Sequence, residues 1–436
     1  MSERVIVVGA GLAGLAAARE LLAQGVETTV LEARERVGGR TWSVVDESTG
    51  FAMDMGAEWV SPGHHTTIEA ELARHGLALV EPEADGRSDW FLDAGLRHGD
   101  QPLVGDELVA FEALVVALEK DAARVDARSA DWHAAAADLD VPFNAYLDSI
   151  GAEGAARDRV HIRCCALMGA HADEYSALTM LHEIASYGSV EAAFEGDSRR
   201  VAGGTGTLAA AIAAGLPEGV VRLGTPVRAV RVLPAGGVEV VTDTETLTAD
   251  AVVVAVPVNT LRDVDLDVEL TPAAREAIAV GQAGRVAKVW LHTEGLPAPL
   301  MTLGWPLVPE AYTVPAERGQ AVAAFELVDP TDPATTTTAV IGELTRRYPE
   351  AVVAEENLGH DWLNDPWARG TWHTARAGQQ QGWADLAATS GPVLFAGGDL
   401  SRRWVGWMDG ALTSGADAAG RAVALLRTGT TPPVAG

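Results

Sequence analysis

The feature that most constrains the fold is a glycine-rich turn between a strand-like and a helix-like segment near the N-terminus. Residues 5–8 form a continuous apolar run, as expected of a parallel strand buried on both faces. Residues 12–24 are rich in alanine and leucine, and residues 28–31 are β-prone. The turn itself, residues 9–14, has the pattern G-x-G-x-x-G. The sequence therefore predicts a βαβ unit at the start of an α/β domain.

Each residue of this pattern has a physical function in a dinucleotide site. Gly9 allows the sharp turn, Gly11 lets the backbone approach a pyrophosphate, and Gly14 lets the helix pack on the strand. The helix N-terminus presents unpaired N–H groups to the phosphate charge. Glu32 ends the second strand, where a carboxylate can bind both ribose hydroxyls. The alternative is a glycine turn without a ligand, and the strand, helix and acid in register argue against it.

The length of 436 residues predicts two domains, because one ordinary core rarely grows so large. Residues 105–190 have a helical pattern, whereas residues 220–256 resemble a series of short strands. A helix follows, with Thr271 as N-cap. We expect a nucleotide-binding α/β domain of separated segments, with a second domain of sheet and helix inserted. The nucleotide-binding domain is expected at 1–75, 200–285 and 375–430, the second domain at 76–199 and 286–374, and a flexible tail at 431–436.

Charge and composition exclude several classes of partner. The net charge of −29 argues against nucleic acid and anionic lipid. No apolar run is long enough to span a bilayer, and the N-terminus has no signal-peptide pattern, so we expect no membrane partner. Cys164 and Cys165 are adjacent and poorly placed to staple a fold, which predicts a reducing, cytoplasmic setting. No histidine shows metal-ligand spacing, so no metal is expected. The oligomeric state, a homodimer included, stays open.

Further glycine segments indicate an extended ligand. Arg34 and Arg40 flank a glycine pair at 38–39, so the chain can pass close to a second stretch of the ligand. The small pair at 56–57, in "MDMGAEWV", can lie against a flat ring. A third glycine loop, "VAGGTGTLAAAI", stands before a helix at 201–212. These segments are more than a nicotinamide dinucleotide needs.

With these motifs the chain resembles, from end to end, the flavin-containing amine oxidase family of monoamine and polyamine oxidases. Within it the chain is most similar to the bacterial hydroxynicotine oxidase branch. The stretches that carry the resemblance are "DLDVPFNAYLDSI", "SALTMLHEIA", "DWLNDPWARGTW" and "FAGGDLSRRWVGWMDGAL". The resemblance implies FAD as cofactor, bound by a Rossmann-like domain of the GR2 flavoprotein type, with an inserted α+β substrate domain.

The resemblance also implies particular contacts with FAD. Asp399 takes a ribityl hydroxyl; the alternative on sequence alone is a helix-capping or turn aspartate, which its position in the family disfavours. The backbone N–H of Met408, at a helix start, faces the N1/C2 carbonyl edge of the flavin, where a helix N-terminus stabilises negative charge. The residues implied to contact the adenosine and pyrophosphate end of FAD are Glu32, Arg34, Gly39, Arg40 and the backbone of Val227. Gly56 and Ala57 are implied to lie near the isoalloxazine.

Three residues are implied at the reaction centre. Trp372 and Trp407 occupy the family positions that flank the substrate nitrogen, where many relatives have tyrosine. Their aromatic faces orient the amine without donating a hydrogen bond to its lone pair; without the resemblance they would be ordinary core tryptophans. Lys288 lies mid-strand, where an inward lysine is costly unless it has a task. In the family this lysine bonds through a water to flavin N5 and helps reoxidation by oxygen.

Other implied positions refine the pocket. Thr371 falls where some monoamine oxidases carry a cysteine bonded to flavin, so FAD is expected to be non-covalent. Tyr312 is expected to line the pocket. Ala166 stands where the hydroxynicotine branch has asparagine, which argues against hydroxynicotine itself as substrate.

The expected reaction is the oxidation of a small-molecule amine. Hydride passes from the α carbon to flavin N5, the imine hydrolyses to an aldehyde or ketone, and O2 reoxidises FAD to give hydrogen peroxide. The alternatives on the same fold are a desaturase and an L-amino-acid oxidase, which would need an arginine for the substrate carboxylate. An alternative of another class is a flavin-binding protein without catalysis, which the presence of Lys288 and both tryptophans disfavours.

Overall fold

The computed structural model confirms the N-terminal βαβ unit. Strand β1 (Arg4–Val8) leads into α1 (Leu12–Ala23), and β2 (Glu27–Leu31) returns beside β1 in parallel. The side chains of β1 are buried because structure covers both faces of its sheet. The structure describes residues 3–47, 50–81, 86–304, 308–315, 320–328 and 336–434.

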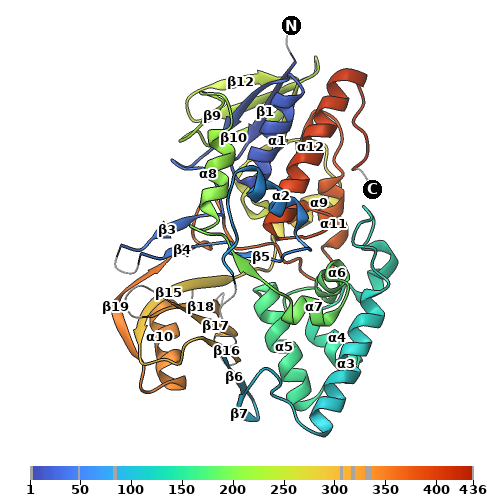
Figure 1. Ribbon diagram of the computed structural model, residues 1–436. Helices are drawn as coiled ribbons and strands as arrows, with labels where there is room; N and C mark the ends of the chain where they lie inside the picture. The colour runs from blue at the N-terminus through green and yellow to red at the C-terminus, as the bar shows by residue number, and fades with distance from the viewer. Residues whose placement is uncertain are drawn as a thin grey trace.

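Five parallel strands form the sheet at the top of Figure 1, in the order β20-β13-β1-β2-β9. The added strands are β9 (Val221–Arg222), β13 (Ala251–Val254) and β20 (Val393–Phe395). They come from parts of the chain far from β1 and β2, so the sheet is assembled from separated segments, as predicted. In a sheet of this kind, ligands bind at the carboxyl ends of the strands.

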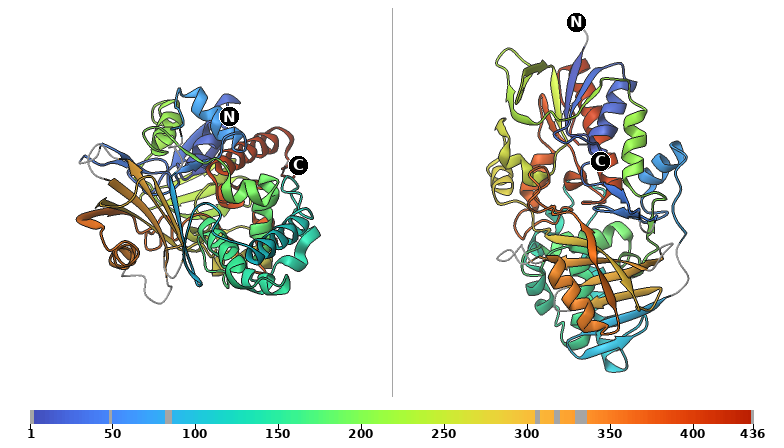
Figure 2. Two further views of the ribbon diagram at one scale, coloured as in Figure 1. Left: turned by 60° about the horizontal axis from the view of Figure 1, so that its bottom comes forward. Right: turned by 90° about the vertical axis from the view of Figure 1, so that its left-hand side faces the viewer.

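Helices α1 and α12 (Met408–Thr428) cover one face of this sheet and pack against each other (Figures 1 and 2). They approach closely because position 415 is glycine: a Cβ there would lie 2.0 Å from the carbonyl oxygen of Ala13. Helices α2 (Thr66–Arg74) and α8 (Gly206–Ala214) extend the same apolar layer.

The opposite face carries a four-stranded sheet in the order β12-β11-β10-β14, together with two helices. Helix α9 begins as predicted, because the Thr271 hydroxyl accepts a hydrogen bond from the backbone N–H of Ala274 at 3.2 Å. The elements of this layer are β10 (Val227–Val232), β11 (Val238–Thr242), β12 (Thr246–Ala249), the 3-10 helix η2 (Val258–Asp263), β14 (Asp265–Asp267), α9 (Pro272–Val280) and α11 (Gln380–Ala387).

A seven-stranded sheet lies at the lower left of Figure 1, in the order β19-β15-β18-β17-β16-β6-β7. Its strands are antiparallel except for the parallel pair of β6 and β16, and α10 packs on one face. The bounds are β6 (Arg87–Leu92), β7 (Gly95–His98), β15 (Val286–Glu294), β16 (Leu300–Gly304), β17 (Glu310–Pro315), β18 (Gln320–Leu327), α10 (Thr336–Arg347) and β19 (Val352–Gly359).

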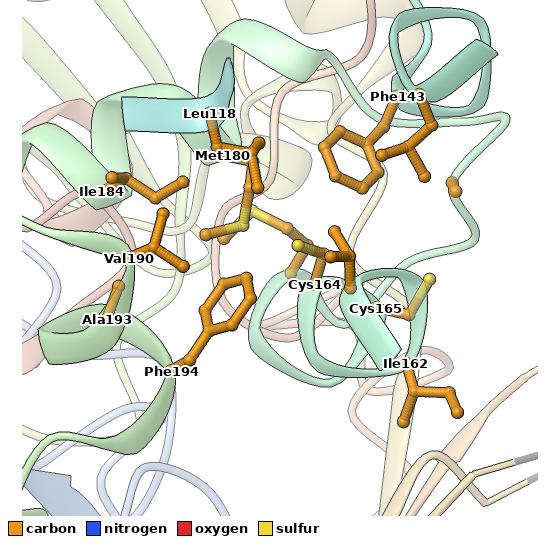
Figure 3. Close-up of a cluster of buried hydrophobic side chains, with 14 of the residues drawn as sticks. Leu118, Phe143, Ile162, Cys164, Cys165, Met180, Ile184, Val190, Ala193 and Phe194 are labelled. Atoms are coloured by element: carbon orange, nitrogen blue, oxygen red, sulfur yellow. The ribbon is translucent and has the colours of Figure 1, made fainter. Parts of the chain in front are cut away.

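A group of helices lies beside this sheet, at the lower right of Figure 1. Their core, drawn in Figure 3, is made of aliphatic, aromatic and sulfur-bearing side chains, among them Cys164 and Cys165. Sheet and helices together give the inserted α+β arrangement that was predicted, whereas the residue boundaries between domains stay a prediction. The helices are α3 (Asp106–Ala122), the 3-10 helix η1 (Ala134–Leu139), α4 (Phe143–Ser149), α5 (Gly154–Met168), α6 (Ala177–Tyr187) and α7 (Val190–Glu195).

Short elements connect the larger parts. They are β3 (Ser43–Val45) paired with β4 (Ala52–Asp54), β5 (Trp59–Val60) paired with β8 (Arg199–Arg200), and the 3-10 helix η3 (Gly398–Leu400). In the ranges that the structure describes, no helix combines the length and apolarity needed to cross a membrane.

The flexibility of the tail at 431–436 stays a prediction. In the structure the Thr431 hydroxyl accepts a hydrogen bond from the backbone N–H of Gly391 at 3.0 Å, and the carbonyl of Pro432 accepts one from Arg421 at 3.2 Å. The last residues of the tail, 435–436, lie outside the described residues.

Candidate active site

One cavity follows the carboxyl edge of the parallel sheet and continues to the seven-stranded sheet. Residues just after β1, β2, β13 and β20 line one end, and side chains of β15 and β18 line the other. Its lining thus reaches from the glycine turn to a second sheet, a span that suits an extended ligand with room for a further molecule at the far end.

The glycines of the G-x-G-x-x-G turn serve different purposes. Gly9 has a φ of +98°, and a Cβ there would lie 2.8 Å from the carbonyl oxygen of Ala255. At Gly14 a Cβ would lie 1.9 Å from the carbonyl oxygen of Gly9, so glycine permits the helix to pack. At Gly11 a Cβ would meet nothing closer than Gly38 O at 3.9 Å, and Gly11 lines the cavity. The open space beside Gly11 therefore belongs to the cavity, where the backbone can approach a ligand.

Glu32 is buried at the end of β2 and is fixed by two backbone donors. Its Oε2 accepts a hydrogen bond from the N–H of Ala10 at 2.7 Å, and its Oε1 accepts one from the N–H of Arg34 at 2.8 Å. Each oxygen keeps a lone pair, and Glu32 lies on the cavity wall. The carboxylate can thus accept hydrogen bonds from ligand hydroxyls.

The two arginines of the second glycine segment are each paired with an aspartate from far along the chain. Arg34 Nη2 lies 2.8 Å from Asp365 Oδ2, and Arg40 Nη2 lies 2.7 Å from Asp399 Oδ1. Arg40 Nη1 also donates to the carbonyl of Thr371 at 2.7 Å. Both arginines line the cavity, but their charge is balanced and their side chains are held in place.

Asp399 has two protein partners, and its predicted contact with a ribityl hydroxyl stays a prediction. Its Oδ2 accepts a hydrogen bond from the backbone N–H of Val258 at 3.0 Å, while Oδ1 forms the ion pair with Arg40. The side chain is buried and is not on the cavity wall, which the backbone of Gly397 and Gly398 forms instead. The carboxylate thus holds Arg40 and the start of η2.

Helix α12 starts at the cavity. Met408 is its first residue and lines the cavity, and the N-cap residue Trp407 makes no side-chain cap hydrogen bond. The first-turn carboxylate, Asp409, is turned away and accepts a hydrogen bond from Ile68 at 2.8 Å. The positive end of the helix dipole can therefore stabilise an anionic edge of a ligand.

Trp372 and Trp407 both line the cavity, and the protein satisfies both of their indole N–H groups. Trp372 Nε1 donates to the carbonyl of Leu167 at 2.9 Å, and Trp407 Nε1 donates to Glu183 Oε1 at 2.7 Å. Neither donor is left for a ligand, so the two side chains offer the cavity apolar ring atoms. Gly169 makes room for Trp372, since a Cβ there would lie 2.5 Å from its ring.

Lys288 of β15 lies on the cavity wall at the end opposite the glycine turn, and only 4% of the residue is exposed. Its Nζ is ion-paired with Glu58 Oε2 and donates to the carbonyl of Gly56 at 3.3 Å. The Tyr312 hydroxyl donates to the same Glu58 oxygen at 2.5 Å. The lysine is thus inward-facing and has a buried carboxylate partner.

Comparison with known proteins now decides the family. The sequence profile described as flavin containing amine oxidoreductase matches residues 12–423. The chain belongs to the flavin-containing amine oxidase family. It is 31% identical to (S)-6-hydroxynicotine oxidase of Paenarthrobacter nicotinovorans, over 93% of this chain and 96% of that protein. It is 30% identical to nicotine dehydrogenase of Pseudomonas putida, over 94% of this chain and 86% of that protein.

The solved structures agree with this assignment. A putrescine oxidase bound to putrescine superposes with a TM-score of 0.85 at 26% identity, covering 97% of this chain and 99% of the other. The resemblance is confirmed: the chain is an FAD-dependent amine oxidase. The residues present fit the cofactor, because Gly11 leaves space on the wall, Glu32 keeps free lone pairs and α12 points its N-terminus inward.

The structure brings most of the predicted site residues of this amine oxidase together in one cavity. Four are not on its wall: Gly14 serves helix packing, Asp399 binds Arg40, Tyr312 turns to Glu58, and Ala166 lies half-buried on α5. Those on the wall are Gly9, Gly11, Glu32, Arg34, Gly39, Arg40, Gly56, Ala57, Val227, Lys288, Trp372, Trp407 and Met408.

Two buried titratable groups lie behind Trp407. Burial raises the pKa of Glu183 to about 7, although the hydrogen bond from Trp407 opposes the shift. Burial lowers the pKa of His65 to about 3, and its ring centroid lies 4.7 Å from that of Trp407. His65 Nδ1 accepts a hydrogen bond from the Ser61 backbone at 3.0 Å, so the neutral imidazole carries its proton on Nε2.

Several residues that contact the predicted site residues or line the cavity were missed from the sequence. Glu58 stands next to the small pair at 56–57, and a carboxylate there was a usable signal. Glu183 lies on α6, whose residues are nearly all buried, and burial on every side is invisible in the sequence. Gly169 looks like an ordinary helix C-cap, which it also is. Phe325, on β18 opposite Lys288, gave no signal beyond an apolar strand.

Proposed function

We propose that this amine oxidase acts on monoamines with an apolar body, which bind as the free base between Trp372 and Trp407. The observation that carries the proposal is the single cavity that joins the glycine turn to both tryptophans and Lys288. FAD, when bound, supplies the two-electron oxidation of the amine. The chain supplies orientation, an apolar slot and the fixed positive end of α12.

The aromatic slot supports binding of an unprotonated nitrogen. Both indole N–H groups are engaged by protein acceptors, so neither competes for the amine lone pair. Phe325 and Val286 continue the apolar wall. Two of the described residues that line the cavity carry a carboxylate. Glu32 directly follows β2, and Asp263 is the last residue of η2. No described carboxylate stands in the slot to bind an ammonium.

The same walls argue against two other substrate classes. A diamine would need an acidic partner for its second nitrogen, and an amino acid would need a free arginine for its carboxylate. The described arginines on the wall, Arg34, Arg40 and Arg228, are paired with Asp365, Asp399 and Asp243 respectively. An aryl-substituted or cyclic monoamine, the class to which the name of the hydroxynicotine relative belongs, fits better than a substrate such as putrescine.

We further propose non-covalent FAD and O2 as the acceptor. Thr371 lines the cavity, whereas Cys164 and Cys165 are buried in the helical core (Figure 3). The charge of Lys288 on the wall favours the oxygen reaction, because oxygen gains two electrons and two protons to become hydrogen peroxide. Two buried, free thiols are also consistent with the reducing cytoplasm.

Anaerobic mixing with a panel of amines tests the proposal. The panel holds an arylalkylamine, a nicotine-like cyclic amine, putrescine and an α-amino acid, and flavin absorbance is followed in time. We expect bleaching by the first two, with a rate that rises with pH as the amine loses its proton, and peroxide when air is admitted. Fast bleaching by putrescine or by the amino acid alone would overturn the substrate assignment.

A matched pair of variants locates the reaction. Trp407→Phe keeps an aromatic face but loses the hydrogen bond to Glu183, and is expected to lower kcat/KM for the amine roughly 10-fold. Trp367→Phe changes a tryptophan of the same cavity that lies under Arg228, and is expected to affect FAD affinity alone. Equal effects of the two variants on the amine step would contradict the assigned slot.

A further inference from the structure

We propose that Glu58 is the positioning residue that holds Lys288 as a directed cation on the cavity wall. The inference rests on the proposed function only in assigning Lys288 to the oxygen step. Glu58 is not itself among the described residues that line the cavity, so it acts through Lys288, which is. It supplies a buried negative charge in contact with the lysine.

The contacts of Lys288 leave one N–H group for the cavity. An ammonium has three donors. One is directed to Glu58 Oε2 and one to the carbonyl of Gly56 at 3.3 Å. The aromatic rings of Trp290 and Phe325 lie 5.1 and 5.4 Å from Nζ and restrict the remaining directions. Since Lys288 lies on the wall, the third N–H is available to a molecule in the cavity.

Glu58 is itself locked by a second donor. It directly precedes β5, is buried, and accepts at one oxygen from both Lys288 and the Tyr312 hydroxyl. Its other oxygen, Oε1, is buried and has no hydrogen-bond partner among the described residues. A buried carboxylate placed in this way is costly unless it is paired with a cation. The arrangement thus binds the lysine firmly and in one orientation.

Other charged groups around the pair are few. Asp54 faces both members, and burial together with repulsion by Glu58 raises its pKa to about 6, so it is ionised above that pH. Its Oδ1 accepts hydrogen bonds from Ser43 and Thr205, and none from Lys288. Arg200 and Glu310 act on Tyr312, the further neighbour. Asp54 therefore acts on Lys288 only through its charge, whereas Glu58 also forms a hydrogen bond with the lysine.

Removal of the Glu58 charge has a defined consequence. A lysine whose ion-pair partner is removed loses the contact that directs its ammonium group. In the Glu58→Gln variant the side chain of Lys288 should lose its fixed orientation toward the cavity. The oxygen step, which gains from a nearby positive charge, should slow, while the amine step, which depends on the tryptophan slot, should not.

Rapid-mixing measurements of the two half-reactions provide the first test. We expect E58Q to reduce the rate of reoxidation by O2 roughly 10-fold and to leave anaerobic reduction by the amine within about 2-fold of the native enzyme. The double variant E58Q/K288M should be no slower than K288M, because Glu58 acts only through Lys288. Native reoxidation in E58Q, or full additivity of the two changes, would overturn the inference.

A second test does not depend on catalysis. The chain contains two lysines, Lys120 and Lys288, so K120R leaves one lysine to observe. With lysine labelled with ¹³C at Cε in the FAD-loaded protein, K120R should give one sharp Lys288 signal, as expected of a side chain held in one orientation. In K120R/E58Q the signal should shift and broaden, because the ion pair that holds the side chain is gone. A signal that behaves identically in both proteins would refute the role of Glu58.

Two more variants keep the inference testable if E58Q fails to bind FAD. Tyr312→Phe removes the other donor to Glu58 without removing a charge, and the lysine signal should be unchanged. Glu58→Asp keeps the charge but shortens the side chain, so the lysine signal should shift less than in E58Q while reoxidation slows. If K288M reoxidises at the native rate, the oxygen role of Lys288 is wrong, and the lysine signal still decides whether Glu58 holds the side chain in place.

Discussion

The carboxyl group of Glu183 leads to a quantitative prediction about stability and pH. It lies on α6, fully buried, and accepts a 2.7 Å hydrogen bond from the indole N–H of Trp407. Burial raises its pKa from 4.5 to about 7, against the opposing effect of that hydrogen bond. The shift corresponds to about 3 kcal/mol between the two protonation states, in order of magnitude.

The sign of the effect follows from which state binds the proton. Between pH 4.5 and about 7 the folded protein holds a proton on Glu183 that the unfolded chain has released. The free energy of unfolding therefore falls as pH rises through this window, and the loss of about 3 kcal/mol is complete above it. Below pH 4.5 both states are protonated and the group contributes no pH dependence.

Glu183→Gln removes the titration and keeps an oxygen acceptor for Trp407. At pH 5 the variant should resemble the native protein in stability, because native Glu183 is then largely protonated. At pH 8.5 it should be the more stable protein, by up to about 3 kcal/mol less the stronger bond to a charged acceptor. Thermal unfolding of the FAD-loaded proteins at both pH values should show a relative gain of roughly 3–6 °C.

The control is Glu191→Gln on α7, an exposed carboxylate that should leave the pH dependence unchanged. If native protein and E183Q lose the same stability between pH 5 and pH 8.5, the carboxyl is not the buried acid that the structure describes. A second readout is kcat/KM for the amine: E183Q should keep it nearly constant, whereas Glu183→Leu, which leaves the indole N–H unpaired, should lower it.

Three further predictions concern the cofactor end and the buried acids. Gly11→Val fills the space on the ligand side, so the FAD dissociation constant should rise at least 10-fold in a flavin fluorescence titration while apoprotein unfolding stays unchanged. Asp54→Asn should abolish a loss of about 3 kcal/mol between pH 4 and 6, since the raised pKa of about 6 makes the folded state hold the proton there; urea unfolding at both pH values measures it. Arg40→Ala strands the buried carboxylate of Asp399 and should cost about 3–5 kcal/mol, with partial recovery in the R40A/D399N double variant; denaturant unfolding decides.

The parts of the site that could be predicted from the sequence are those that local geometry determines. The glycine turn and Glu32 follow from one strand, one helix and a second strand in register, so their positions relative to each other are fixed over 24 consecutive residues, 9 to 32. The start of α12 at Met408 is local in the same way. The resemblance added the tryptophans and Lys288, whose distant segments no periodicity could have joined.

The parts that could not be predicted are the ion pairs and hydrogen bonds between side chains that lie far apart in the sequence. Arg34 bonds to Asp365, 331 residues away, and Arg40 bonds to Asp399 although both were assigned to the cofactor. A charged residue shows in the sequence, but whether it faces a ligand or another side chain depends on packing that brings remote segments together. Tyr312 illustrates the same point, because Glu58 captures its hydroxyl.

The pairing of these cations has a consequence for the whole enzyme. The chain carries a net charge of −29, yet the described cations on the cavity wall each have a carboxylate partner. The net negative charge favours the approach of protonated amines, while the described wall residues offer an ammonium no unpaired acid near the tryptophans. If the amine binds as the free base, as proposed, it approaches as a cation and loses its proton before the aromatic slot binds it. On that proposal, selection between amines rests on apolar fit rather than on charge.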